Sequence, residues 1–534
     1  MSLAQRCVAL FFIASILPTA LAANHAAALT CENLASLKLS HTTITVAQSI
    51  PQGNYTAPDG EVFQNMPAFC RVAATLTPTG DSSIGIEVWM PSSTWNGRFE
   101  GVGNGGYAGS IPYSAIAPGV FLGYATVGTD TGHTGSSTDD GSFALGHPEK
   151  IIDFGYRSIH LMTVIGKRIS SAFYGEDAQH SYFTGCSTGG RQALMEAQRY
   201  ANDYDGIVAG DPVAHYTHHH VGANLWVVWQ MFNNPASTVF TTQDTLLGNA
   251  VNAACDALDG VIDGVLNDPR RCHYDPAALQ CTGSQTPPNC LTAEQVDAVR
   301  HLWTGPDEFV GMRDYYPPFE RGGEIDGWPS TISPEPPPAP QTDSHAQIGI
   351  PFFQNFVFDN PNWNFRSFDW ATDPAYVESK VVVPGQTLAS VLNSIDPDLE
   401  RFHARGGKLI QYHGFSDPEV PPLTSINYFE SVVRFPAGSP EWKQTSEFYR
   451  LFMVPGMNHC KGGPGANVFD MLSPLVDWVE QDVAPERILA THYVNNEPDE
   501  GVAFTRPLCS YPQEAVYKGS GNTNDPANFV CSNR

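Results

Sequence analysis

The sequence predicts an α/β fold in which helices cover a mostly parallel sheet on both faces and a large insertion interrupts the core. Short apolar runs alternate with helical stretches from about residue 84 to 210, and the alternation resumes after residue 408. No such alternation is visible between residues 214 and 395. Strands that alternate with helices build parallel sheets. We therefore expect one core from residues 23–213 and 396–534, with residues 214–395 inserted as a second domain.

Predicted strands and helices alternate through the first half of the core. The runs IGIEVWM (84–90) and YATVGTD (124–130) are predicted strands. RFEGVGNGGYAG (98–109) is a predicted strand that ends in a glycine-rich loop. Residues 159–175 have the apolar spacing of a helix and end at Gly175, a common helix terminator. The stretch HSYFTGCSTGGRQALMEAQRY that follows predicts a strand, a tight turn and a helix.

The second half of the sheet follows the insertion. KLIQYHGFSDPEVP (408–421) predicts a strand that leads into a loop, and YRLFMVPGMNHC (449–460) predicts another. The insertion itself holds four cysteines, a proline run and the aromatic clusters LWVVWQMF and NWNFRSFDW. We expect it to contain little regular secondary structure.

Charge excludes two classes of partner. The 534 residues include 28 Lys+Arg and 55 Asp+Glu, a formal net charge of −27. Such a surface repels phosphate backbones and anionic lipids, so nucleic-acid binding and membrane-surface binding are not expected. Uncharged esters or neutral polymers are compatible with it.

The N-terminus has the pattern of a secretory signal peptide over residues 1–22. Arg6 precedes an apolar run too short to span a bilayer, and a small-residue ALA sequence follows at 20–22. We expect a secreted, extracellular protein. The ten cysteines beyond Cys7 then favour five disulfides, and the sequon at Asn54 is a candidate glycosylation site.

Gly185-Cys186-Ser187-Thr188-Gly189 matches the G-x-S-x-G nucleophile elbow of α/β-hydrolases. The two glycines allow a turn between strand and helix that is too tight for side chains. The turn lifts the serine hydroxyl above the sheet at a helix N-terminus, where the helix dipole favours negative charge. The motif occurs often by chance, so the strand before it and the helix after it carry most of the argument.

Asp417 and His459 are the candidate partners of Ser187. The order Ser, then Asp, then His is the chain order of α/β-hydrolase triads. Both residues follow predicted strands, so both can reach the same edge of the sheet. Taken singly, Asp417 could be a turn-forming aspartate before a proline, and His459 is one of seventeen histidines. Their joint order and placement favour a Ser187-His459-Asp417 triad.

Ser187 and His459 each have a cysteine as immediate neighbour. If the serine and the histidine meet, Cys186 and Cys460 are brought close enough to bond and to tie the elbow to the histidine loop. The remaining cysteines are expected to pair locally, although sequence alone leaves the connectivity open. The expected local pairs are Cys31 with Cys70, Cys255 with Cys272, Cys281 with Cys290 and Cys509 with Cys531.

The Cys-Ser pair, the later aspartate and the His-Cys pair resemble the fungal tannase and feruloyl esterase family, nearest to its feruloyl esterase B branch. The resemblance extends over essentially the whole mature chain. It implies that Ser187 carries the acyl group and that Cys186 and Cys460 form a disulfide. It also implies that residues 214–395 form a lid domain that covers the site and binds calcium.

An oxyanion needs hydrogen-bond donors. The backbone N–H of Thr188, next after the nucleophile, is the expected first donor. The second is expected from the loop GNGGYAG, at Gly105 or Gly106, with Gly106 preferred. The ordinary alternative for this loop is a glycine-rich turn.

A cluster of aspartates predicts a structural calcium site. Asp256, Asp259 and Asp263 fall within eight residues and repel one another unless a cation neutralises them. Hard oxygen ligands favour calcium, and the backbone carbonyls of Val261 and Val265 are expected to complete the set. The family resemblance points to the same positions. The alternative is a solvated acidic turn, and no organic cofactor is expected.

These features predict a secreted serine esterase that uses an acyl-enzyme mechanism. Its expected substrates are hydroxycinnamate esters (feruloyl, caffeoyl and p-coumaroyl) of plant cell-wall polysaccharides, as in xylan degradation. The near alternative is a tannase that cleaves gallate esters, and a remote one is a non-catalytic, calcium-dependent plant-polymer binding protein. The aromatic clusters of the insertion could hold a phenolic ring, or they could be ordinary core.

Overall fold

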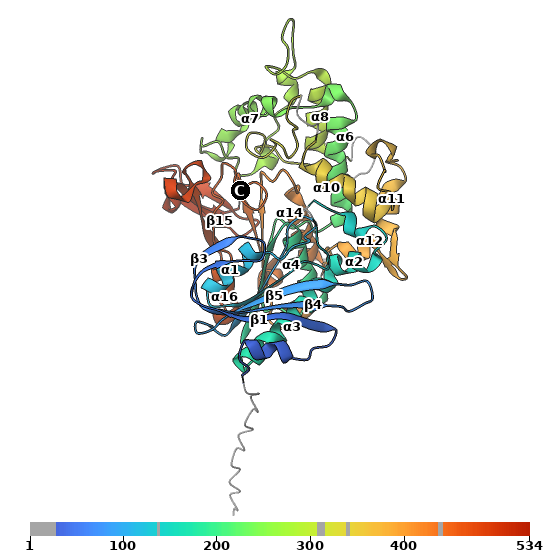
Figure 1. Cartoon of the computed structure of the whole chain (residues 1–534). Coiled ribbons are helices and arrows are strands. Elements are labelled where there is room, and N and C mark those ends of the chain that lie inside the picture. Colours follow the sequence, from blue (N-terminus) through green and yellow to red (C-terminus); the bar gives the residue numbers. More distant parts are fainter. Residues whose placement is uncertain (1–27, 136–138, 307–314, 338–341, 436–441, 534) are drawn as a thin grey trace, which may run out of the picture.

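The computed structural model describes residues 28–135, 139–306, 315–337, 342–435 and 442–533 (Figure 1). The predicted signal peptide, residues 1–22 with Cys7, lies outside these ranges. Among the helices described, none is both long enough and apolar enough to cross a membrane.

A nine-stranded mixed sheet forms the centre of the molecule. Its first four strands pair antiparallel, and every pairing from the fourth strand onward is parallel. The mostly parallel α/β fold predicted from the sequence is confirmed. In sheet order the strands are β1 (Thr42–Ile50), β4 (Phe69–Leu76), β5 (Ile84–Pro91), β7 (Ala125–Thr129), β6 (Arg98–Val102), β8 (His180–Cys186), β9 (Gly206–Gly210), β12 (Lys408–Gly414) and β13 (Tyr449–Val454).

Helices cover the sheet on both faces, as successive strand residues point to opposite sides. Phe183 faces a core shared with α3 (Ser158–Tyr174), α4 (Thr188–Arg199) and α14 (Leu423–Arg434). Its neighbour Tyr182 faces a core shared with α16 (Leu472–Gln481). On that second face, α1 (Tyr113–Phe121) packs against Trp89 and Val102. The core also contains three short helices, α2 (Pro148–Ile152), α13 (Glu400–Ala404) and α15 (Trp442–Thr445).

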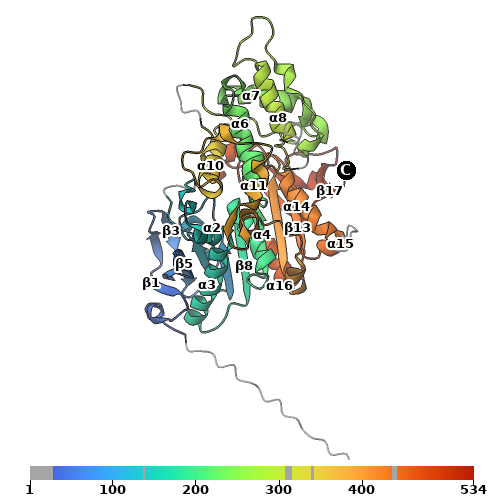
Figure 2. The same cartoon turned by 90° about the vertical axis from the view of Figure 1, so that its right-hand side faces the viewer.

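The regular structure of the insertion is helical and more extensive than expected, so the expectation of little regular structure is wrong. Its helices are α5 (Tyr216–His219), α6 (Trp226–Phe232), α7 (Thr241–Cys255), α8 (Ala293–Thr304), α10 (Ser344–Phe352), α11 (Asp373–Ser379) and α12 (Leu388–Leu392). A helix that is buried all round shows no amphipathic period. That is the case for α6, in which five of seven residues are buried. Both views place α6, α7, α8 and α10 beyond one end of the sheet (Figures 1 and 2).

Short two-stranded sheets complete the fold. They are β2 (Gly53–Thr56) with β3 (Val62–Met66), β10 (Val381–Val383) with β11 (Gln386–Thr387), β14 (Arg487–Tyr493) with β15 (Val502–Cys509), and β16 (Glu514–Tyr517) with β17 (Phe529–Ser532). Five disulfides join the same cysteine pairs that were expected from the sequence.

Candidate active site

Ser187 stands in a strained turn between β8 and α4. Its φ of 64° and ψ of −123° lie outside the regions that side chains favour. The turn is possible because glycines stand two residues before and two residues after the serine: a Cβ at Gly185 would lie 2.6 Å from the carbonyl of Gly189. The carbonyl of Ser187 accepts the N–H of Arg191 at 3.0 Å, which starts α4 immediately after the serine. The elbow geometry therefore follows from the G-x-S-x-G pattern.

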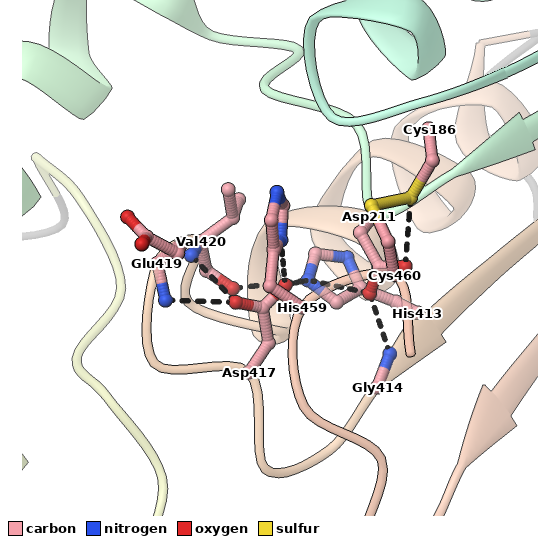
Figure 3. The surroundings of a disulfide bond; sticks show 9 residues. All are labelled: Cys186, Asp211, His413, Gly414, Asp417, Glu419, Val420, His459 and Cys460. Carbon is pink, nitrogen blue, oxygen red and sulfur yellow. Dashed lines mark hydrogen bonds and ion pairs between the residues drawn. A yellow bond between two sulfur atoms is a disulfide. The ribbon is translucent and has the colours of Figure 1, made fainter. Parts of the chain in front are cut away.

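Asp417 and His459 meet where the loops after β12 and β13 come together (Figure 3). His459 Nδ1 lies 2.7 Å from Asp417 Oδ2. The other oxygen, Oδ1, accepts the N–H groups of Glu419 at 2.8 Å and Val420 at 2.9 Å. The carboxylate is thereby held in one orientation, and the histidine keeps Nε2 free to accept a proton.

The buried pair polarises both groups. Burial alone would raise the pKa of Asp417, but the charge of His459 and the hydrogen bonds of His413 and His459 hold that pKa well below its usual range. Burial alone would lower the pKa of His459, yet the charge of Asp417 and its hydrogen bond raise it to about 9. The arrangement stabilises an imidazolium, as a general base requires after it takes a proton.

A disulfide ties the elbow to the histidine loop. Cys186 and Cys460 are bonded with a Cα–Cα distance of 6.0 Å across 274 residues of sequence. Ser187 and His459, their immediate neighbours, line one cavity of about 1080 Å³. The structure thus brings Asp417 and His459 into direct contact and places Ser187 and His459 in one cavity.

Two buried residues of this cluster, His413 and Asp211, were missed by sequence reasoning. His413 Nε2 lies 3.2 Å from Asp417 Oδ2 and 2.9 Å from the carbonyl of Val420. Its Nδ1 lies 2.6 Å from Ser425 Oγ. His413 and His459 therefore both contact Oδ2 of Asp417 (Figure 3). The signal was present in the sequence as a histidine at the end of a predicted strand, four residues before the aspartate.

Asp211 follows β9, the strand between β8 and β12, so the ends of four neighbouring strands contribute to the cluster. Its Oδ1 accepts the N–H of Gly414 at 2.8 Å. Its Oδ2 lies 3.3 Å from Cys186 Sγ. A disulfide sulfur carries no hydrogen, so a hydrogen bond at this contact requires a proton on the carboxyl. Burial raises the pKa of Asp211 to about 7, consistent with that assignment.

The glycine loop after β6 lies against the start of α4. Thr188 Oγ1 donates to the carbonyl of Gly106 at 2.7 Å, and Thr188 is buried. The loop is also held by Asn104, whose N–H donates to Gln192 Oε1 at 3.0 Å. Gly105, Gly106 and Thr188 all line the cavity beside Ser187. Their role as oxyanion donors stays a prediction.

The insertion reaches the cavity through residues other than its aromatic clusters. Trp226 and Trp363, one from each cluster, are buried in separate apolar cores, and neither cluster lines the cavity. These clusters are therefore ordinary core, and the idea that they hold a phenolic ring is wrong. The insertion instead contributes Tyr216 and Ile348, beside Val213 and Val420 of the core.

The predicted calcium loop follows α7. Asp256 accepts the N–H groups of Asp263 and Gly264, and Asp259 accepts that of Val261. Asp263 Oδ2 pairs with Arg506 of β15 at 2.7 Å. The loop therefore joins the insertion to the C-terminal strands.

The donor set of this loop is compatible with calcium. Burial, and more weakly the charge of Asp263, raises the pKa of Asp259 to about 6. Within the described chain, no hydrogen bond ends on the carbonyl oxygens of Val261 and Val265. Carboxylates and free carbonyls are the hard oxygen ligands that calcium takes.

Asn54 of the predicted glycosylation sequon is exposed on β2. Its Oδ1 accepts the N–H of Asn65 at 3.1 Å.

Comparisons with known proteins agree with this geometry. A family model described as tannase and feruloyl esterase matches residues 70–532. An uncharacterized esterase of Xanthomonas campestris pv. campestris is 41% identical, covering 96% of this chain and 92% of its own. A probable feruloyl esterase B-2 of Aspergillus terreus is 33% identical, covering 94% of each chain. The crystal structure of feruloyl esterase B from Aspergillus oryzae superposes with a TM-score of 0.82 at 29% identity, covering 94% of this chain and 99% of that one.

Proposed function

The chain belongs to the tannase and feruloyl esterase family and is a carboxylic ester hydrolase, and from this premise we propose that it hydrolyses hydroxycinnamate esters of plant cell-wall polysaccharides. The observation that carries the mechanism is the contact of 2.7 Å between His459 and Asp417 beside the disulfide that joins the Ser187 and His459 loops. Feruloyl, caffeoyl and p-coumaroyl esters are the expected members of the substrate class.

The proposed reaction has two halves. His459 Nε2 takes the proton of Ser187 as the hydroxyl attacks the ester carbonyl, and Asp417 stabilises the imidazolium that results. The imidazolium then protonates the leaving alcohol, which departs and leaves an acyl group on Ser187. Water, activated by the same histidine, attacks the acyl-enzyme and releases the phenolic acid.

The negative charge of each tetrahedral intermediate needs donors that are already in place. We assign this role to the backbone N–H of Thr188 and to the N–H of Gly106. The hydrogen bond from Thr188 Oγ1 to the carbonyl of Gly106 supports the assignment, because it holds the two segments together.

The acyl group is assigned to the lid arm, the part of the cavity lined by Val213, Tyr216, Ile348 and Val420. Three of these side chains are apolar and one is aromatic, which suits a flat cinnamoyl ring. A tannase activity is the second candidate. Polar groups of His219 and His220 line the same cavity, and a gallate ring with three hydroxyls needs such partners.

One set of rate measurements separates these candidates. Initial rates are compared on methyl ferulate, methyl caffeate, methyl p-coumarate and methyl gallate, with Ser187→Ala as the inactive control. The cinnamates are expected to be preferred. A kcat/KM for methyl gallate about tenfold or more above the cinnamates would establish the tannase activity instead. Hydrolysis by Ser187→Ala near the wild-type rate would remove Ser187 from the mechanism.

Secretion and a structural calcium ion belong to the same proposal. Five disulfides support an oxidising, extracellular compartment, and exposed Asn54 is a candidate glycosylation site there. Asp256, Asp259 and Asp263 would hold the calcium, with the carbonyls of Val261 and Val265. At this position the ion would neutralise the negative charge of the three aspartates.

A further inference from the structure

The cavity that contains Ser187 and His459 extends well beyond the lid arm. Its other part lies on the core, between α1 and the segment 469–472 that leads into α16. We name this part the sheet groove and define it by Glu100, Thr184, Val208, Tyr412 and Phe469. Figure 1 shows α1 and α16 in the lower left part of the molecule, whereas α6, α7 and α8 of the insertion lie at the top.

The floor of the sheet groove is a strip of the sheet face between α1 and α16, made of side chains from four neighbouring strands. Thr184 of β8 pairs with Val208 of β9, while Glu100 of β6 pairs with Tyr182, two residues before Thr184. Tyr412 of β12 pairs with Gly210, two residues after Val208. Since side chains two residues apart share a face, all four floor side chains point to the same side.

Glu100 places a buried polar atom in this floor beside α1, since a Cβ at Gly119 would lie 2.2 Å from its Oε2. Its Oε1 accepts a hydrogen bond from Thr184 Oγ1 at 3.0 Å. Its Oε2 is buried and has no hydrogen-bond partner, although the residue is only 4% exposed. Burial raises the pKa of this carboxyl to about 7, so near neutral pH it is able either to donate or to accept. Buried polar groups are nearly always paired, so Oε2 calls for a partner that the described protein atoms do not supply.

The wall of the sheet groove is aromatic, and its rim is polar. The ring of Phe469 packs edge-on against Tyr412, with centroids 5.1 Å apart, and is half-buried. Ser114 of α1 and Asp470 are exposed at the rim. An aromatic wall beside carboxyl and hydroxyl groups matches a sugar ring, which has apolar C–H faces and a rim of hydroxyls.

We propose that the sheet groove binds the carbohydrate part of the ester, that is, the uncharged sugar residues on the alcohol side. The direction of the ester rests on the proposed function, which assigns the acyl group to the lid arm, whereas a polymer must continue into solvent. The cavity residues Ser114, Leu122 and Asp470 are exposed, so this side of the cavity is accessible to solvent. The net charge of −27 favours a neutral sugar over an acidic one.

The first test measures sugar binding without any ester chemistry. Ser187→Ala protein is titrated calorimetrically with acyl-free xylo- and arabinoxylo-oligosaccharides, alone and with Phe469→Ala or Glu100→Gln added. Oligosaccharide binding is expected, and each added variant should weaken it by about tenfold, the effect of one lost packing or hydrogen-bond contact to a polar ligand. Val468→Ala, an exposed neighbour outside the cavity, is the matched control. No oligosaccharide binding to the Ser187→Ala protein overturns the proposal.

The second test uses two substrates with the same acyl group. The loss of kcat/KM in Phe469→Ala should be about tenfold greater on a feruloylated arabinoxylo-oligosaccharide than on methyl ferulate. Equal losses on the two substrates overturn the proposal, because they place the acyl group at Phe469. Phe469→Ala changes a half-buried side chain, so this test stands even if Glu100→Gln fails to fold. Failure of the esterase mechanism would appear separately, as hydrolysis by Ser187→Ala, and would leave the calorimetric result standing.

Discussion

At the residue scale, the electrostatics of the site converge on Asp417. One of its oxygens faces both His459 and His413, and the other accepts two backbone N–H groups. The tautomer of His413 follows from its neighbours. Ser425 Oγ accepts from Gln411 Nε2, which leaves its own hydrogen for His413 Nδ1, so Nε2 carries the proton that faces Asp417. His413 is thus a positioning residue that acts through Asp417.

His413→Phe tests this role. A hydrogen bond to a charged group is worth about 1.5–3 kcal/mol, so kcat should fall by about tenfold to a hundredfold. KM should change less, because His413 does not line the cavity. Loss of the donor leaves more negative charge on Asp417 and raises the pKa of His459. Activity requires neutral His459, so the acidic limb of the pH–rate profile should move to higher pH.

His413→Gln is the matched variant, because its amide keeps an N–H donor near the position of Nε2. It should retain more activity than His413→Phe and a smaller shift of the acidic limb. If both variants lose activity only in proportion to their unfolded fraction, with an unmoved pH profile, His413 has only a packing role.

At the element scale, the loop from 455 to 465 carries the candidate base and depends on contacts outside itself. Cys460 bonds it to the elbow. Gly456 has a φ of 67°, and a Cβ there would lie 2.9 Å from Val265 Cγ1 of the predicted calcium loop. Two distant segments therefore restrain the position of His459.

The double variant Cys186→Ala/Cys460→Ala should lose activity out of proportion to stability. In the simple chain-entropy model a loop this long contributes about 5.6 kcal/mol, but the bond also ties the loop of His459 to the turn of Ser187. Activity at a temperature where the variant stays folded, read beside its Tm, separates the two effects. Full activity in a folded variant would show that the bond serves stability alone.

Calcium removal should lower the Tm and reduce activity together. At a hundredfold excess over Kd, a ligand of the folded state adds about 2.7 kcal/mol. Melting curves are recorded with chelator, then with calcium or magnesium restored, for wild type and Asp259→Asn. Asp297→Asn, an exposed acid on α8, is the control. Chelator-independent melting, with no calcium found by elemental analysis, contradicts the site.

At the scale of the whole molecule, acidic residues outnumber basic ones both in the sequence and among the buried charged residues described. Burial raises the pKa values of Glu100, Asp130 and Glu324 to about 7. In the unfolded chain these groups titrate near pH 4. Between about pH 4 and 7 the folded state therefore binds more protons than the unfolded state, and their contribution to stability is lost as pH rises through this window.

The Tm should accordingly be higher at pH 5.5 than at pH 8, measured at one saturating calcium concentration. Glu324→Gln removes one of these charges while keeping an acceptor for the N–H of Gly322. This substitution should narrow the difference in Tm between pH 5.5 and pH 8, because it stabilises the protein at pH 8 by on the order of 1 kcal/mol or more. A Tm that rises from pH 5.5 to 8 in the wild type would contradict the assignment.

The sequence by itself determined the features that depend on short segments. The glycines around Ser187 require the tight turn, whatever surrounds it, and the apolar runs required a mostly parallel sheet. Strands of one parallel sheet end at one edge, so Ser187, Asp417 and His459 could be expected to meet there, with Cys186 and Cys460 beside them.

Only the tertiary structure decided what depends on register and on packing between distant segments. Strand register places Glu100, Thr184, Val208 and Tyr412 on one face, and no local pattern reports it. Helix α6 of the insertion showed no amphipathic period because most of its residues are buried. Asp211 and His413 lie in the site because β9 lies between β8 and β12. This convergence of side chains is a property of the assembled sheet and of no single segment.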